Sequence, residues 1–165
     1  MKLELRSIIT PVRAIDSDLI PEGWEVESDD PEGEISFFNL DFSFCPIQSD
    51  EYIDGDFMLR RAGACKAYGS LGLAAALLKL KEKREEEWKK IFPVDSRDNY
   101  YIMPRTILIT GSHSRVVACL IWRGGEWTIR FCWLDYAFSN GARFIRPRDS
   151  LELRIAALRH EKRNW

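Results

Sequence analysis

Asp41 and Lys66 are the residues of this chain whose types and spacing best fit metal-assisted chemistry. Asp41 lies in the alternating segment 35–44, amid aromatic residues, where a charged side chain is expected only if it is paired or functional. Lys66 precedes a glycine–serine turn and an alanine-rich segment. Two carboxylates on adjacent strands can hold a divalent cation, and a nearby lysine can orient or activate the attacking water.

The order of these residues resembles the PD-(D/E)XK nuclease superfamily, particularly its nuclease-like domains in fungal proteins. In that superfamily a strand bearing Asp is followed by a strand with Glu-x-Lys, a Gly-Ser turn, a long helix, an antiparallel hairpin and a closing helix. The resemblance covers about residues 35–165. It implies that Asp41 and Lys66 are the catalytic residues, with Mg²⁺ or Mn²⁺ as the cofactor of an active enzyme.

The chain departs from the motif at Ala64, which stands where the superfamily has Glu. The implied metal site therefore lacks one carboxylate ligand and should bind a divalent metal poorly. Asp56 is the candidate replacement ligand, with Asp54 and Glu51 as alternatives from the same segment. The sequence of residues 52–56 (YIDGD) is also typical of an ordinary turn.

The two principal residues also have structural interpretations. Asp41 can be a solvent-exposed strand aspartate, and Lys66 a solvated lysine before a helix. If these interpretations hold, we expect neither a cofactor nor catalysis.

Three classes of function follow. The favoured one is a degenerate, non-catalytic nuclease-like domain that binds nucleic acid or a protein partner through its basic C-terminal end and one face of a hairpin. The second is an active Mg²⁺- or Mn²⁺-dependent nuclease with a relocated carboxylate. The third is an acidic inhibitor or immunity-type protein that masks a basic partner.

The charge distribution motivates the last class. Residues 1–60 contain 15 acids and four bases, whereas residues 140–165 contain seven bases and three acids, in a chain of net charge −2. Attraction within the chain, together with ordinary solvated surface, explains this asymmetry better than a dedicated site does. A pI near 5.8 argues against strong nonspecific DNA binding.

Residues 116–133 predict a β-hairpin in detail. Gly124-Gly125 supplies the positive φ angles of a tight turn, so that Arg123 faces Glu126 and Trp122 faces Trp127. Side chains alternate along strands, which places one wholly apolar set on a core face. That set is Val116, Ala118, Leu120, Trp122, Trp127, Ile129, Phe131 and Trp133. The opposite, mixed set is Val117, Cys119, Ile121, Thr128, Arg130 and Cys132.

The rest of the chain predicts a single domain over residues 1–165. We expect strands at 2–9, 35–44, 57–65 and 106–110, a helix at 70–92 capped by Ser70, a last helix from Asp149, and loops at 97–103 and, acidic, at 16–34. The fold class is α+β: a mixed, largely antiparallel sheet with a long central helix and a C-terminal helix packed on it. The resemblance implies the restriction-endonuclease-like arrangement.

The remaining residues favour no further chemistry. His113 is expected in an exposed turn, and His160 near a helix end. Cys119 and Cys132 are near each other on the mixed face, which leaves free thiols and a disulfide both open. The chain has no apolar run of membrane-spanning length and no signal-peptide pattern, so we expect an intracellular protein of the cytoplasm or nucleus with no membrane partner.

Overall fold

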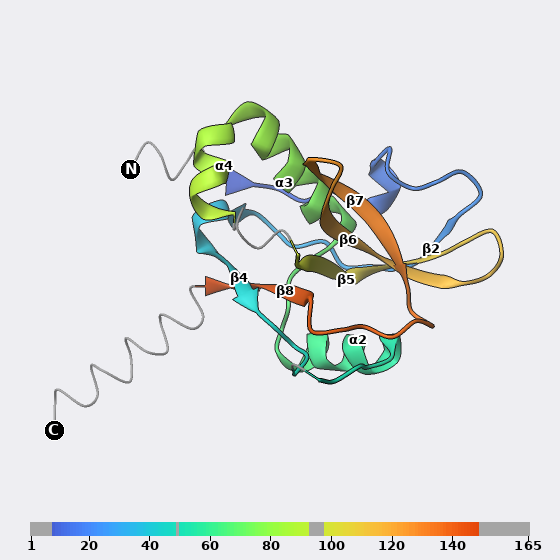
Figure 1. The fold of residues 1–165 in the computed structure, drawn as a ribbon. Coiled ribbons are helices and arrows are strands. Elements are labelled where there is room, and N and C mark those ends of the chain that lie inside the picture. Colours follow the sequence, from blue (N-terminus) through green and yellow to red (C-terminus); the bar gives the residue numbers. More distant parts are fainter. Residues whose placement is uncertain (1–7, 49, 93–97, 149–165) are drawn as a thin grey trace, which may run out of the picture.

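The computed structural model describes residues 8–48, 50–92 and 98–148, which form an α+β fold around a mixed, mostly antiparallel sheet (Figure 1). The sheet order is β4-β8-β5-β6-β7, and β2 pairs with the far half of β5. Only the β5–β8 pairing is parallel within this sheet. The strands are β1 (Ile8–Ile9), β2 (Glu25–Asp29), β3 (Ile35–Ser36), β4 (Leu40–Phe44), β5 (Tyr100–Ile109), β6 (Arg115–Arg123), β7 (Glu126–Trp133) and β8 (Ala142–Pro147).

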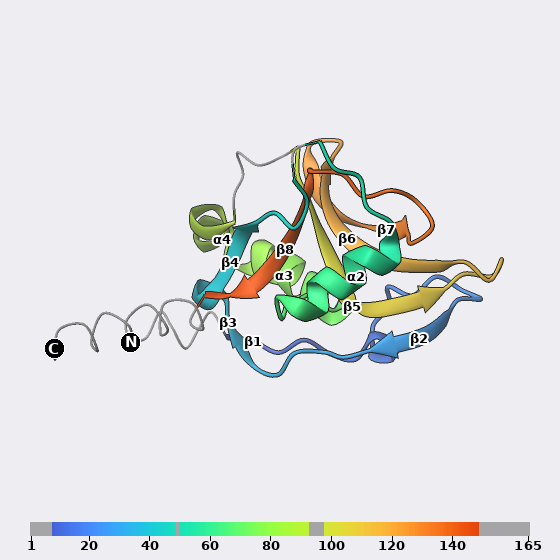
Figure 2. The same cartoon turned by 90° about the horizontal axis from the view of Figure 1, so that it is seen from below.

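Helices cover both faces of this sheet. Helices α3 (Leu71–Lys83) and α4 (Glu85–Ile91) lie on one side, and α2 (Gly55–Ala64) lies on the other (Figures 1 and 2). Two separate apolar clusters reflect this arrangement: one contains the buried residues of α3 and the other those of α2. The expected α+β class, with a mixed and largely antiparallel sheet, is therefore confirmed. The expected C-terminal helix lies outside the described residues.

The β6–β7 hairpin has the predicted register. Arg123 pairs with Glu126 and Trp122 with Trp127, and Gly124 and Gly125 have φ angles of 62° and 85°. The apolar face packs against α3, α4 and neighbouring strands, and its residue Trp127 is only 4% exposed. Trp133 corrects the prediction: it lies at the end of β7 and is 37% exposed rather than part of the core.

We call the apolar side of the hairpin the core face. The other side is only partly covered, because α2 packs over Val117 in the second apolar cluster. Beyond this contact lie the residues that we call the cavity face: Cys119, Ile121, Arg123, Arg130 and Cys132. The mixed composition of this side thus reflects two environments along the same strands.

The prediction of a strand over residues 57–65 is wrong, because this segment is helix α2. The Asp54 side chain accepts a hydrogen bond from the Phe57 backbone N–H at 2.7 Å and begins the helix. Met58 and Ala62, four residues apart, form its buried stripe. The cap and the i, i+4 spacing outweigh the apolar run that suggests a strand.

The predicted helix over residues 70–92 is two helices. Ser70 caps α3 as expected, accepting a hydrogen bond from the Leu73 N–H at 3.0 Å. The helix breaks at Arg84, whose φ and ψ are −146° and 57°. No apolar residue occurs between 81 and 87 to continue the buried stripe. After the break, α4 buries Trp88, which stacks on Phe92 with ring centroids 4.2 Å apart.

The acidic segment 16–34 is not the continuous loop that its composition predicts. Glu25–Asp29 form strand β2 at the edge of the sheet. Its carboxylates are held by the fold: Asp29 accepts hydrogen bonds from the Ala14 N–H and the Thr106 hydroxyl. The buried Glu32 accepts from the Gly69 N–H and the Ser70 hydroxyl, both at 2.6 Å.

Two other boundaries also differ from the prediction. A 3₁₀ turn over Phe37–Asn39 interrupts the strand expected at 35–44, and it turns Phe37 into the core. The loop expected at 97–103 already belongs to β5 from Tyr100 onward, because β6 and β8 supply partners there. Within the described ranges, no helix is long and apolar enough to cross a membrane.

Candidate functional site

Asp41 lies on β4, at the edge of the sheet, with its carboxylate already engaged. Its Oδ1 accepts hydrogen bonds from the Ser43 hydroxyl at 2.6 Å and the Ser43 N–H at 3.0 Å. Its Oδ2 lies 3.6 Å from a guanidinium nitrogen of Arg146, its register partner on β8. Burial opposes ionisation, but the Ser43 hydrogen bonds and the positive charges of Arg146 and Arg148 lower the pKa of Asp41.

The cation beside the Asp41 carboxylate is the guanidinium group of Arg146. The Arg146 guanidinium lies 3.8 Å from the centroid of the Phe44 ring, so its position is fixed by stacking as well as by Asp41. Within residues 8–48, 50–92 and 98–148, no group of three or more His, Cys, Asp or Glu side chains could hold a metal ion. The residues around Asp41 therefore do not fit a divalent metal.

Lys66 follows helix α2, and its conformation has a structural explanation. Its φ of 54° is the left-handed conformation that ends many helices, a position usually taken by glycine. The N–H of Ala67 donates to the carbonyl of Ala62, and the N–H of Lys66 donates to that of Gly63, closing the helix end. The exposed Lys66, two residues after Ala64, thus terminates a helix, and the described segment 55–64 is a helix where the motif needs a strand.

The candidate replacement carboxylates each have a separate partner. Asp56, in the first turn of α2, lies 3.1 Å from Arg115 at the start of β6. Asp54 caps α2, and Glu51 forms an ion pair with Arg61 at 2.7 Å. Asp41 and Asp56 therefore contact different arginines, and no contact joins either of them to Lys66 in the described structure.

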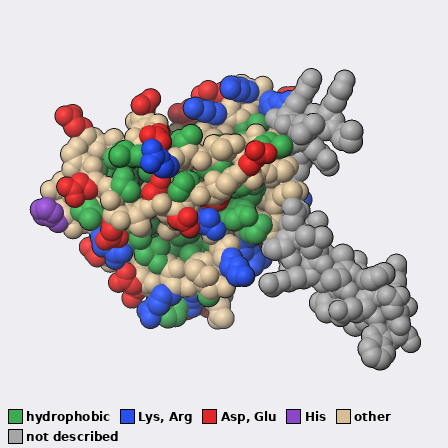
Figure 3. All heavy atoms as spheres, turned by 180° about the vertical axis from the view of Figure 1, so that it is seen from behind, with side chains coloured by type: hydrophobic (Ala, Val, Ile, Leu, Met, Phe, Trp, Pro, Cys, Tyr) green, Lys and Arg blue, Asp and Glu red, His purple; other side chains and the backbone are tan. Residues whose placement is uncertain are grey.

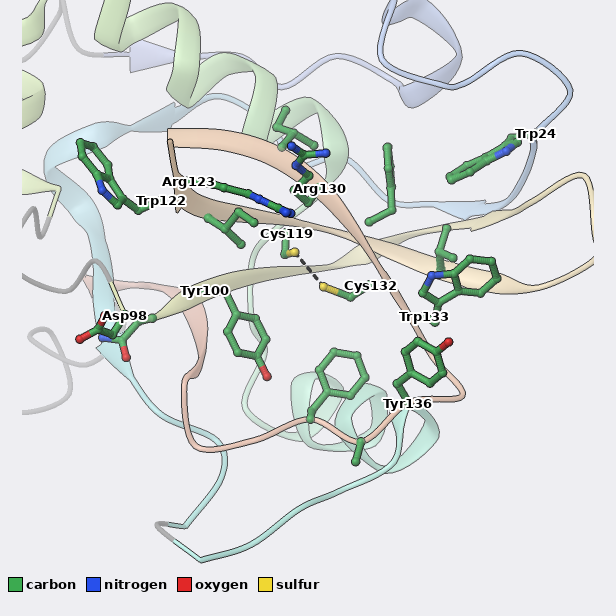
Figure 4. A pocket seen from close by; sticks show the side chains of 17 residues that line it. Trp24, Asp98, Tyr100, Cys119, Trp122, Arg123, Arg130, Cys132, Trp133 and Tyr136 are labelled. Atoms are coloured by element: carbon green, nitrogen blue, oxygen red, sulfur yellow. Dashed lines mark hydrogen bonds between the residues drawn. The ribbon is translucent and has the colours of Figure 1, made fainter. Parts of the chain in front are cut away.

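A second candidate site is a cavity of about 800 Å³ along β7 (Figure 4). The cavity face of the hairpin forms one wall, and the segments around Tyr100 and Tyr136–Phe138 form another. Trp24, Phe131 and Trp133 extend it around the edge strand. Its volume is within the range of pockets that hold small organic ligands.

Two arginines without an ion-pair partner line this cavity. Arg123 and Arg130 lie on the same face of the hairpin, both exposed, and neither forms a salt bridge with any described residue. Arg115, at the other end of β6, differs: it is 3.0 Å from Glu27 and 3.1 Å from Asp56. The cavity thus presents positive charge that no described residue neutralises.

Exposed aromatic rings accompany these arginines. Trp133 and Tyr136 are 37% and 67% exposed, and their ring centroids lie 6.2 Å apart at one end of the cavity. Trp24 packs edge-on against Phe131 at 5.0 Å. Asp98 lies at the opposite end from Trp133 and Tyr136 (Figure 4). The cavity therefore combines flat apolar surfaces, the carboxylate of Asp98 and two guanidinium groups that form no ion pair with the described part of the chain.

The sequence identified only part of this site. The hairpin alternation correctly placed Cys119, Arg130 and Cys132 on one mixed face. The contributions of Trp24 and of the segment around Tyr136 depend on the tertiary fold, and no local pattern encodes them. A usable signal was the large aromatic side chains of Trp133 and Tyr136 in a stretch that ends the strand.

Charges on the opposite side of the molecule are mixed. Figure 3 shows acidic and basic side chains interspersed over that surface, with no extended patch of one sign. His113 is exposed in the turn before β6, as expected.

No family model, curated protein or solved structure matches this chain.

Proposed function

We propose that this protein is a non-catalytic binding module for single-stranded nucleic acid, and that the ligand binds in the cavity along β7. The observation that carries the proposal is that one cavity is lined both by Arg123 and Arg130, without ion-pair partners among the described residues, and by the exposed rings of Trp133 and Tyr136. Guanidinium groups bind phosphate oxygens in a fork geometry, and bases stack on aromatic rings.

The chemistry of the cavity suits a short segment of single strand. Stacking on an aromatic ring contributes about 1–3 kcal/mol per base and tolerates any base. Two arginines can neutralise about two phosphates, so log K should fall with log salt concentration with a slope of about −1.4. Such a small electrostatic contribution is consistent with a chain whose net charge is −2.

The absence of catalysis and the nuclease-like origin are parts of this proposal. Asp41 accepts a hydrogen bond from Ser43 and forms an ion pair with Arg146, and Ala64 has no carboxylate that could bind a metal. The donors around Asp41 therefore support loss of metal binding. An active metal-dependent nuclease receives no comparable support.

The acidic inhibitor interpretation is also less well supported. Asp29 and Glu32 accept hydrogen bonds from other residues of the fold, and Glu27 forms an ion pair with Arg115. These carboxylates are occupied by the chain itself. They are therefore less available to a basic partner than the composition of residues 1–60 indicates.

Binding of a labelled single-stranded oligonucleotide, followed by fluorescence anisotropy, tests the proposal. The double variant Arg123→Ala/Arg130→Ala should bind at least about tenfold more weakly, because the loss of two charge-assisted contacts exceeds about 1.4 kcal/mol. The matched control is Lys79→Ala/Lys83→Ala, which removes the same charge from exposed positions of α3. Equal affinities for the two variants would contradict the proposal.

Two further experiments distinguish this proposal from an active nuclease and from a module that binds acidic proteins. Incubation of the same oligonucleotide with Mn²⁺ should leave it intact, whereas cleavage that Asp41→Ala abolishes would assign an active nuclease. A polyglutamate peptide should bind more weakly than the oligonucleotide. The reverse order would assign the cavity to an acidic protein partner.

A further inference from the structure

Cys119 and Cys132 form a thiol pair in the wall of the cavity. They lie on adjacent antiparallel strands, diagonally across one step of the register, and their Sγ atoms are 2.8 Å apart (Figure 4). We propose that this pair is a redox site that forms a reversible disulfide by exchange with a low-molecular-weight disulfide. This proposal concerns the thiols alone and does not rest on nucleic-acid binding.

The positions of the two sulfurs favour bond formation. A disulfide bond is about 2.05 Å long, so the sulfurs must approach by less than about 1 Å. The strands that carry them are held in continuous register from Val116–Trp133 to Arg123–Glu126. The pair is therefore already positioned, and its effective concentration is high.

The two thiols differ in their acidity, which assigns them different roles. The hydrogen bond between the two thiols lowers the pKa of Cys132, although burial opposes this shift. The same hydrogen bond and burial raise the pKa of Cys119. Cys132 therefore loses its proton first and is the attacking thiolate, while Cys119 remains protonated as the resolving thiol.

The solvent exposure of the two thiols supports the same assignment of roles. Cys119 is 1% exposed, whereas Cys132 is partly exposed, and both line the cavity. A small disulfide that enters the cavity can thus reach Cys132. The other two cysteines have different surroundings: the Cys45 thiol donates to the carbonyl of Ile47, and the Cys65 thiol to that of Ala62.

The reaction balances with oxidised glutathione as the oxidant. The Cys132 thiolate attacks one sulfur of glutathione disulfide, forms a mixed disulfide and releases one glutathione thiolate. The Cys119 thiol transfers its proton to solvent and attacks Sγ of Cys132, which breaks the mixed disulfide and releases the second glutathione. Two cysteine thiols are oxidised, and one glutathione disulfide is reduced to two thiols.

Thiol trapping on the full chain tests this inference. The protein is incubated with oxidised glutathione, quenched in acid, unfolded, alkylated and analysed by intact mass and peptide mapping. We expect the number of alkylated cysteines to fall from four to two, with Cys119 and Cys132 recovered in one disulfide-linked peptide pair. Retention of all four thiols, or linkage of any other pair, would overturn the proposal.

Single variants test the assigned order. Cys119→Ser should accumulate a mixed disulfide at Cys132, because the resolving thiol is missing. Cys132→Ser should leave Cys119 unmodified. The double variant Cys45→Ser/Cys65→Ser serves as the matched control and should form the disulfide at the wild-type rate. Equal glutathionylation of the two single variants would contradict the order, and the wild-type peptide map decides the pairing even if a variant fails to fold.

Discussion

The core face and the cavity face of the β6–β7 hairpin use the same two strands for opposite purposes. On the core face, Trp127 is surrounded by the rings of Phe92, Tyr101 and Trp122, at centroid distances of 4.6–5.8 Å. On the cavity face, Arg123 and Arg130 have no ion-pair partner within the described residues. Because strand side chains alternate, one β-hairpin can stabilise the fold on one side and leave polar groups available on the other.

A similar contrast separates the charges of the molecule. Glu32 accepts hydrogen bonds at the start of α3. Asp41 and Arg115 form ion pairs, at the edge of the sheet and at the start of β6 respectively. Arg123 and Arg130 form no ion pair with residues 8–48, 50–92 or 98–148. Charge that is used for folding can therefore be distinguished from charge that is left for a ligand, and this distinction can be tested by mutation.

The largest expected difference is between two tryptophans of β7. Trp127→Ala should lower the free energy of unfolding by about 3–5 kcal/mol, because it removes a large side chain from a packed core. Trp133→Ala, at the cavity, should lower it by less than Trp127→Ala does, because the Trp133 side chain is 37% exposed, but should weaken oligonucleotide binding. Denaturant unfolding of both variants checks this pair, and comparable destabilisation would contradict the division into two faces.

Glu32→Ala should have the next largest effect on stability. The substitution leaves the Gly69 N–H and the Ser70 hydroxyl without their acceptor at the buried start of α3, at a cost of about 2–3 kcal/mol. Glu34→Ala is the matched control, since Glu34 is exposed and should be replaceable within about 0.5 kcal/mol. Similar melting temperatures for the two variants would show that Glu32 is not a structural residue.

Asp41→Asn should destabilise the protein by about 1 kcal/mol at neutral pH, because the pairing with Arg146 is lost. The folded state lowers the pKa of Asp41 below its ordinary value of 3.8, so its ionised form contributes stability above that value. This contribution disappears as the pH falls through the folded-state pKa.

Thermal unfolding across the acid range checks the Asp41 prediction. The difference between the wild type and Asp41→Asn should be constant above about pH 5 and should shrink below the ordinary pKa of Asp41. A difference that grows on acidification would contradict the assigned ion pair.

The smallest effect is expected at Lys66, and it is stabilising. Lys66→Gly should raise the free energy of unfolding by about 0.5–1 kcal/mol, since glycine adopts the left-handed conformation without strain. Lys66→Ala retains the strain and should be close to the wild type. Loss of stability in Lys66→Gly would show that the side chain does more than end the helix.

How far the sequence predicts this structure depends on the range of the interactions. The hairpin register follows from Gly124-Gly125 and the alternation around it, and the start of α3 follows from Ser70, because both signals are local. The strand predicted over residues 57–65 is wrong, because that prediction follows the apolar run and does not use Asp54 as a helix cap. Strand β2 could not be predicted, because its acidic residues are stabilised by Thr106 and Arg115, far along the chain.

The candidate site shows the same limit. The mixed face of the hairpin was correctly derived, but the cavity also needs Trp24, Tyr100 and Tyr136 from separate segments. Asp41 and Lys66 are predicted as catalytic residues only because their order along the chain resembles the nuclease motif. That order does not reveal that Arg146, on the neighbouring strand β8, forms an ion pair with Asp41.

An NMR titration of the ¹⁵N-labelled protein with a short single-stranded oligonucleotide tests the central claim most directly. We expect amide shifts to concentrate on the cavity face of β6–β7 and on Trp133 and Tyr136, while the amides of α3 stay unchanged. Shifts confined to α2 and the β4–β8 edge, or no shifts at saturating oligonucleotide, would contradict the assignment of the cavity as the binding site.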